Sequence, residues 1–154
     1  MERGYLSSTN KEAAYKDAVR ESFLWLGVTD VVKPDPAAPA DITKSKTENA
    51  FDFFYNANLG NPNVDYTSAT DKLKLIAYQK FLALSGLDFM ELWTEYRRNG
   101  SYPAIPLSQN TSRTGGIPNR LLFTQNEINY NSDNVPLKGR VSGDQFTEKI
   151  WWMP

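Results

Sequence analysis

The sequence has neither cysteine nor histidine among its 154 residues. This absence excludes disulfide bonds, zinc–thiolate sites, cysteine nucleophiles, histidine metal sites and every catalytic triad that uses histidine. No apolar run approaches the roughly 20 residues that a helix needs to span a bilayer. The first residues, Met1 to Gly4, lack the basic and then apolar pattern of a signal peptide. We therefore expect either a cytoplasmic protein or an exported one whose N-terminal signal precedes this sequence.

An excess of either charge is also missing. There are 17 Lys and Arg against 18 Asp and Glu, which gives a net charge of −1, and like charges do not form blocks. Such a chain has no general attraction to nucleic acid or to an anionic membrane, so we expect no nucleic-acid partner. A length of 154 residues suits one domain with one core, which we predict over residues 1–154.

Aromatic residues, by contrast, are plentiful. The chain has four Trp, eight Tyr and eight Phe, together with many Asn. This combination suits a surface that stacks on sugars and hydrogen-bonds to them. It equally suits a loop-rich domain with an aromatic core, so composition leaves both interpretations open.

Capping signals predict the first helix over Asn10–Leu26. Thr9 and Glu12 have capping-box spacing, and Gly27 suits a left-handed helix end. The residues that we predict to pack on this helix are Ala14, Tyr15, Ala18, Val19, Ser22, Phe23, Trp25 and Leu26.

A proline-rich linker over residues 29–45 follows this helix. Its segment "KPDPAAPAD" has three prolines within six positions and cannot continue a helix. Ser45 and Glu48 then have capping-box spacing and predict a short helix over about 46–56. The apolar face of that helix comprises Phe51, Phe54 and Tyr55.

Two further helices are predicted in the middle of the chain. One begins near Ser68 and ends or bends at Gly86, and the next is capped by Asp88. The predicted buried residues of the first are Leu73, Ile76, Ala77, Phe81 and Leu84. Those of the second are Phe89, Leu92, Trp93 and Tyr96, which lie on one helical face.

The end of this last helix explains the unusual stretch "ELWTEYRRNGSYPAIP". Arg97 and Arg98 lie in the final turn, where a positive charge stabilises the negative end of the helix dipole by about 0.3–1 kcal/mol. Gly100 suits a left-handed cap. We interpret Trp93, Tyr96, Arg97, Arg98 and Gly100 as structural residues; clamping of an anion by the two arginines is the alternative.

Helical periodicity stops after Pro103, and residues 104–154 are rich in Pro and Gly. Short extended pieces are predicted at Arg120–Phe123 and Lys149–Met153, which allows a small β-hairpin. The predicted fold is therefore mainly α, with long loops in the C-terminal third.

The adjacent indoles of Trp151 and Trp152 are the strongest aromatic pair. In an extended strand they would point to opposite faces, so one would be buried and the other would be an exposed platform for a sugar ring. The interpretation that we favour is that both close the end of the core. Tyr102, Tyr130, Trp151 and Trp152 are thus candidate carbohydrate-binding residues from their chemistry alone.

Other polar patterns are less specific. The segment "NYNSDN" at 129–134 offers clustered oxygens, but it lacks the spacing of a calcium loop, and Asn and Asp more often bond within turns. Glu91 and Glu95 lie four residues apart on one helix, as a glycosidase pair could, yet such acids are usually only solvated. We predict no catalytic residue, no metal and no cofactor.

Several segments together resemble the SusD/RagB-like (SusD-like) outer-membrane nutrient-binding lipoproteins. The fairly specific pattern is a helix that leads into Trp-x-x-x-Arg-Arg-x-Gly, followed by Ile-Pro-x-Arg, in which Arg120 is the last residue. The resemblance covers nearly the whole chain outside 29–50. Its matching pieces are residues 2–28, 72–84, 91–103, 115–135 and 148–154.

The resemblance implies tetratricopeptide-like helix pairs and places the chain in the C-terminal part of such a protein. It implies a non-catalytic component of an outer-membrane uptake system that binds oligosaccharides or other nutrients and works with a TonB-dependent SusC-like transporter. Family members are lipid-anchored at the cell surface, and the anchor signal is not in this sequence. Arg120 is implied to be structural, and no ligand residue is implied.

The resemblance also implies that Glu2 to Gly4 are the tail of a helix that begins upstream. We then expect the first helix to lack a packing partner, and its apolar face to be covered by self-association or by rearranged segments. Two functions from other classes stay open: a glycoside hydrolase with a carboxylate pair, and a helical interaction fragment without a ligand.

Overall fold

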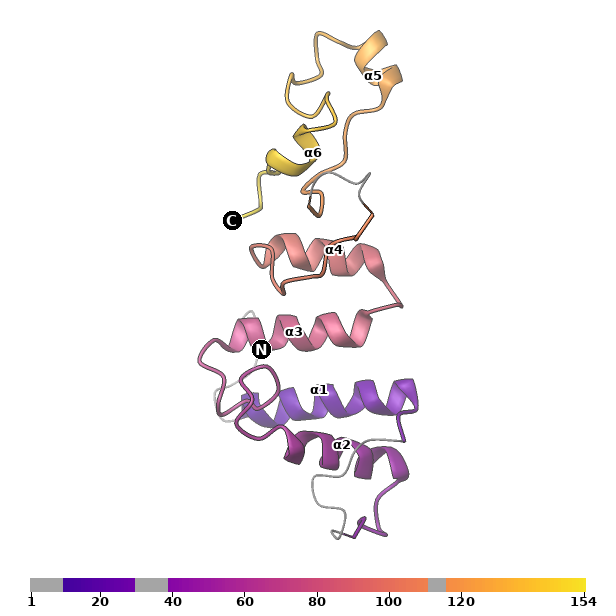
Figure 1. The fold of residues 1–154 in the computed structure, drawn as a ribbon, viewed down its shortest axis with the longest axis vertical. Coiled ribbons are helices and arrows are strands. Elements are labelled where there is room, and N and C mark those ends of the chain that lie inside the picture. The colour runs from indigo at the N-terminus through magenta and orange to yellow at the C-terminus, as the bar shows by residue number, and fades with distance from the viewer. Residues whose placement is uncertain (1–9, 30–38, 111–115) are drawn as a thin grey trace. The chain divides into compact units, whose positions relative to one another are not determined.

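The computed structural model describes residues 10–29, 39–110 and 116–154. Within these ranges the chain forms six helices and no strand, so the prediction of a mainly α fold is confirmed (Figure 1). The chain divides into two compact units, Met1–Trp93 and Thr94–Pro154. No helix in the described ranges is both long enough and apolar enough to cross a membrane.

Helices α1 (Lys11–Leu26) and α2 (Lys46–Ala57) form an antiparallel pair in the first unit. The ring of Phe23, late in α1, lies 5.8 Å from that of Phe51, whereas Lys16, early in α1, lies 4.7 Å from the ring of Tyr55. Helix α3 (Lys72–Leu84) packs on α1 as well, so α1 lies between the other two (Figure 1).

Apolar side chains from all three helices and from the loop before α3 form one core. Burial of a large apolar side chain contributes about 1.5–3 kcal/mol, so this cluster is the main stabilising element of the first unit. Its buried members are Tyr15, Val19, Phe51, Tyr55, Val64, Ala69 and Leu75, each at most 6% exposed.

Two predictions about α1 are wrong. The helix does not lack a packing partner, because α2 and α3 cover it on two sides. Trp25 and Leu26 are 72% and 48% exposed, since they lie in the last turn beyond Phe23, which is the residue that reaches the core. The N-cap is Asn10, whose side chain makes no capping hydrogen bond; Thr9 lies outside the described residues.

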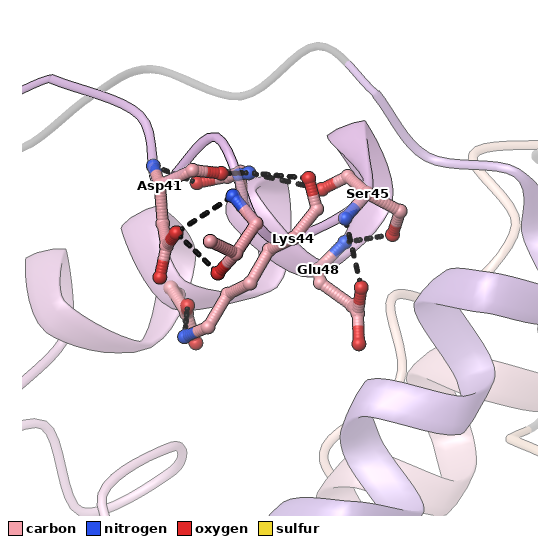
Figure 2. A network of polar contacts seen from close by, with 7 residues as sticks. Asp41, Lys44, Ser45 and Glu48 are labelled. Carbon is pink, nitrogen blue, oxygen red and sulfur yellow. Dashed lines mark hydrogen bonds and ion pairs between the residues drawn. The ribbon is translucent and has the colours of Figure 1, made fainter.

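The start of α2 is fixed by a network of polar contacts (Figure 2). The capping box is confirmed: the amide of Glu48 donates to Ser45 Oγ, and the amide of Ser45 donates to Glu48 Oε2 at 2.8 Å. The buried side chain of Asn49 accepts from the amide of Asp41 at 2.7 Å and donates to three carbonyls, those of Asp41, Lys44 and Ser45. The last part of the predicted linker is therefore an ordered turn, while residues 30–38 lie outside the described ranges.

The loop between α2 and α3 is organised around the carboxylate of Asp65, which is 5% exposed. It accepts hydrogen bonds from Ser68 Oγ at 2.5 Å, from the amide of Gly60 at 3.0 Å, and from the amide and hydroxyl of Thr67. Tyr15 Oη donates to the carbonyl of Val64 at 2.7 Å and joins the loop to α1. A segment that the sequence predicts to be irregular is thus pinned to the core.

Helix α3 begins at Lys72 with Asp71 as its N-cap, so the predicted start near Ser68 is wrong. Asp71 accepts from the amides of Leu73 and Lys74, whereas the Ser68 hydroxyl is committed to Asp65. Leu73 is 54% exposed and was wrongly assigned to the buried face of this helix. Leu75, which is 1% exposed, is the residue of α3 that lies in the core.

Helix α4 (Phe89–Arg98) begins after Asp88, which caps it as predicted by accepting from the amides of Met90 and Glu91. The prediction of which residues of this helix are buried is only partly right. Phe89 is 77% exposed, Leu92, Trp93 and Tyr96 are half-buried, and the one fully buried residue of this helix is Arg97.

The last third of the chain contains two short helices, α5 (Gln125–Tyr130) and α6 (Asp144–Thr147). The predicted extended pieces at Arg120–Phe123 and Lys149–Met153 are not strands, and the described residues contain no β-hairpin. Thr124 starts α5 directly after the first piece by accepting from the amide of Glu127, and a turn bends the second.

Acid should weaken the first unit through Asp65. The Ser68 hydroxyl, then the Gly60 amide and Thr67, hold the pKa of this carboxyl well below its ordinary value. Because the folded pKa is below the unfolded one, the stabilisation is complete above about pH 4 and is lost as the pH falls from there toward the folded pKa. Asp65→Asn should flatten this part of the curve when the free energy of unfolding in urea is measured against pH.

Asp17→Asn is the matched control, since Asp17 forms only an exposed ion pair with Arg20 on α1. Its curve should follow that of the unchanged protein. An Asp65→Asn curve that did the same would show that this carboxylate does not govern the acid response.

Candidate functional site

The second unit, Thr94–Pro154, contains every aromatic residue that the sequence analysis proposed for sugar binding. Its first feature is the end of α4. Gly100 has a φ of 66°, the left-handed conformation that glycine adopts most readily. The amide of Gly100 donates to the carbonyl of Arg97 at 3.3 Å, and that of Ser101 donates to Tyr96 at 2.9 Å. This pattern is a Schellman motif, and it closes the helix.

Arg97 lies beneath this cap and is 7% exposed. Its Nη1 donates to the carbonyl of Asn119 at 3.0 Å, and its guanidinium lies 4.9 Å from the ring centre of Trp152. Burial lowers the pKa of Arg97, but a guanidinium stays protonated in proteins. The buried charge is thus placed against a carbonyl oxygen and an aromatic face, both of which attract a cation.

Arg98 has a different environment from its neighbour. Its Nε and Nη2 donate to the two carboxylate oxygens of Glu95, at 3.2 and 2.5 Å, in a bidentate pair. The side chain of Asn99 also donates to Glu95 at 3.4 Å. One arginine therefore faces the interior and the other pairs with an acid on its own helix.

Asn119 connects Arg97 to α6. Its amide donates to the carbonyl of Gln145 at 2.6 Å, and its side chain donates to that of Phe146 at 2.7 Å. The helix itself is preceded by a loop that closes on Asp144, whose Oδ2 accepts from the amides of Gly139, Arg140 and Val141. The Gly139 amide, and then the others, lower the pKa of Asp144, which stays ionised and holds this loop.

Arg120 packs across the same loop. Its guanidinium lies 5.3 Å from the ring centre of Phe123, and a Cβ added at Gly139 would come within 2.9 Å of it. Gly139 also has a φ of 94°, a left-handed backbone conformation that favours glycine here. The amide of Phe123 donates to the carbonyl of Gly139 at 3.0 Å.

Trp151 and Trp152 lie in a turn and not in a strand, yet their environments differ strongly. The amide of Met153 donates to the carbonyl of Ile150 at 3.0 Å and closes the turn. Trp152 is half-buried against Arg97, whereas Trp151 is 94% exposed. The interpretation that both indoles close the core is therefore wrong for Trp151.

The other two candidate aromatic residues lie elsewhere. Tyr102 is half-buried in the turn after α4, before the buried Pro103. Tyr130 is the last residue of α5 and is 88% exposed. Figure 1 shows α5 and the C-terminus at opposite ends of this part of the chain. The structure therefore does not gather Tyr130 and Trp151 into one site.

The polar cluster at 129–134 forms an ordinary turn. The Asn131 side chain donates to Glu127 at 2.5 Å and accepts from Asn134 at 2.6 Å, and Arg140 donates to the carbonyl of Ser132 at 2.6 Å. In the described parts of the chain, no three acidic side chains lie close enough to hold a metal ion.

Sequence reasoning missed the residues that organise this unit, namely Asn119 and Asp144. It also missed α5, although Thr124 and Glu127 have the same capping spacing that predicts α2. No local signal identifies Asn119, because its contacts are to residues 22 to 27 positions away.

Comparison with protein families gives one match. The family described as "SusD-like: Susd and RagB outer membrane lipoprotein" matches residues 2–153, essentially the whole chain. Neither the curated proteins nor the solved structures give a significant match.

The two adjacent arginines should differ in their contribution to stability. Arg97→Met removes a buried cation from the Asn119 carbonyl and from Trp152, which should cost about 2–3 kcal/mol. Arg98→Met removes a partly exposed pair with Glu95 and should cost about 1 kcal/mol or less. Urea unfolding followed by tryptophan fluorescence measures both. Equal losses would contradict the distinct environments described for the two side chains.

Proposed function

The chain belongs to the SusD-like family of nutrient-binding outer-membrane lipoproteins, and from this premise we propose that it is a non-catalytic binding component of an outer-membrane uptake system. In this proposal it captures oligosaccharides or related nutrients at the cell surface and delivers them to a TonB-dependent, SusC-like transporter. A lipid anchor, as in the family, would keep it at the membrane.

The family match over residues 2–153 is the observation that supports this proposal most strongly. The helical fold agrees with it, since the family is built from tetratricopeptide-like helices and α1 with α2 forms such an antiparallel pair. The balanced charge of the chain is consistent with a neutral ligand such as a glycan.

We propose Trp151 as the principal sugar contact of this chain. Its indole is 94% exposed, so a pyranose could stack on it without any rearrangement. The next residue, Trp152, is fixed against Arg97, which limits the motion of the turn that presents Trp151. A rigid aromatic anchor loses little entropy on binding. Tyr102 and Tyr130 are secondary candidates.

Binding without hydrolysis fits the acidic residues better than catalysis does. Glycoside hydrolysis needs two carboxyl groups about 5–10 Å apart with a sugar between them. Glu95, one member of the candidate pair, is engaged by Arg98 and Asn99 on its own helix. The alternatives of a hydrolase and of an interaction fragment without ligand are distinguished by experiment.

A glycan array should show binding of the purified chain to at least one oligosaccharide, and a reducing-sugar assay on the same samples should show no release. Trp151→Ala should weaken this binding at least about tenfold, since ~1.4 kcal/mol of stacking would be lost. Leu137→Ala, which shortens an 81% exposed side chain of the same unit, is the matched control and should bind normally. Release of sugar would identify a hydrolase; silence in both assays would favour the interaction fragment.

The transporter partnership has its own readout. A tagged copy of the chain, produced with a SusC-like transporter of the same cell, should purify together with that transporter from solubilised outer membranes. An unrelated outer-membrane porin in the same extract should remain behind. If the transporter does not stay with the tagged chain during purification, the partnership is contradicted. The proposal of glycan binding is not affected by that result.

A further inference from the structure

The only Asn-Gly pair of the sequence, Asn99 and Gly100, directly follows α4. An asparagine that precedes glycine loses its side-chain amide most readily, because glycine has no side chain to hinder attack by its backbone nitrogen. A chemically labile pair therefore lies in the turn that closes α4 above Arg97.

The loss of the amide, deamidation, needs no enzyme and no reactant other than water. The backbone nitrogen of Gly100 gives up its proton and attacks Cγ of Asn99. The new N–Cγ bond closes a succinimide ring, and the Cγ–Nδ2 bond breaks as Nδ2 takes a proton from the solvent and leaves as ammonia. Water then adds to either ring carbonyl and opens the ring, which leaves aspartate or isoaspartate at position 99.

The fold holds both reacting groups in arrangements that oppose this attack. The amide of Gly100 donates to the carbonyl of Arg97 at 3.3 Å, so the proton that must leave is engaged in a hydrogen bond. Nδ2 of Asn99 donates to Glu95 Oε2 at 3.4 Å. This bond turns the side chain back along the helix and away from the nitrogen of Gly100.

Both hydrogen bonds are long, and contacts with distant residues keep the turn in place. Arg97 is buried beneath it and donates to the carbonyl of Asn119. Pro154 packs against the turn, since a Cβ added at Gly100 would lie 3.6 Å from its Cγ. Ser101 has a φ of 65°, a strained conformation that persists only where the surroundings impose it. The turn therefore opens only when these contacts break.

Deamidation would prevent the turn from closing again in its original form. An aspartate at position 99 would place a second carboxylate beside Glu95, at the negative end of the helix dipole. An isoaspartate has one more carbon atom in the main chain, which would displace Gly100 from the carbonyl of Arg97. Either product would weaken the cap that covers Arg97.

We propose that Asn99 is a spontaneous deamidation site that the cap of α4 keeps closed, so that the chain is modified there only when the second unit opens. An opening that is reversible in the unmodified chain then becomes permanent. This inference does not depend on the binding function proposed above.

The test is the rate at which Asn99 is converted in the full chain, at one mildly alkaline pH and one temperature, with and without concentrated urea. Aspartate and isoaspartate at position 99 are quantified by chromatography and mass spectrometry of proteolytic peptides. Conversion in the folded chain should be at least about tenfold slower than in urea, which corresponds to ~1.4 kcal/mol for opening the turn. Equal rates in the two states, or slow conversion in both, would overturn the proposal.

A pair of variants tests whether the distant contacts keep the site closed. Arg97→Met should speed the conversion of Asn99 in the folded chain at least about tenfold, because it removes the contact beneath the cap. Leu137→Ala, which shortens an 81% exposed side chain of the same unit, is the matched control and should leave the rate unchanged. An unchanged rate in folded Arg97→Met, or an equal rise in Leu137→Ala, would contradict the proposal. If circular dichroism shows that Arg97→Met does not fold, the comparison of the unchanged chain with and without urea decides.

Discussion

The first unit depends on the loop between α2 and α3 and on the hydrogen bonds that fix its conformation. Helices α1 and α2 alone could not enclose Tyr15 and Val19, because a pair of helices leaves one side of each open. The loop between α2 and α3 closes that side, and it does so around a carboxylate that is nearly inaccessible to water. Since Asp65 receives hydrogen bonds from Ser68, Gly60 and Thr67, the charge is stabilised by fixed dipoles and the loop acquires a single conformation. Helix α3 can then lie on α1.

The second unit is also held together by side chains that bond to loop backbone, but it has less regular secondary structure. It has two short helices after α4 and long connecting segments, so most of its backbone groups cannot be satisfied within helices. Side chains take over this task. Arg97 and Asn119 link the end of α4 to α6, and Asp144 gathers three backbone amides of the preceding loop. Because Trp152 is held against Arg97, its neighbour Trp151 can be exposed without being loose. The same contact therefore supports both the folding of the unit and the proposed role of the indole in sugar binding.

Local signals in the sequence predicted what depends on local physics. Ser45 and Glu48 identify the start of α2, and Asp88 that of α4, because a cap involves residues only a few positions apart. The extent of burial along a helix depends on where the partner ends. For that reason Trp25 and Phe89 were assigned to the core although they are exposed, whereas Leu75 was overlooked although it is fully buried. Arg97 and Arg98 are neighbours in the last turn of the same helix, so the sequence predicts the same role for both. They differ in the structure because only Arg97 contacts the distant residues Asn119 and Trp152. For the candidate site, chemistry alone suggested Tyr102, Tyr130, Trp151 and Trp152, and only the structure distinguishes the exposed Trp151 from the half-buried Trp152. That any of them binds a ligand stays a prediction.

The bonding of Asp65 has a consequence for the ionic strength that the first unit tolerates. Dissolved salt screens the attraction between opposite charges, with a range of about 8 Å at physiological concentration, so the surface pair of Lys16 with Glu12 weakens in brine. Asp65 is bonded to hydroxyl and amide groups that bear no net charge, and it is shielded from the solvent where the ions are. We therefore expect the loop that closes the core to stay folded as the salt concentration rises, whereas the surface ion pairs weaken.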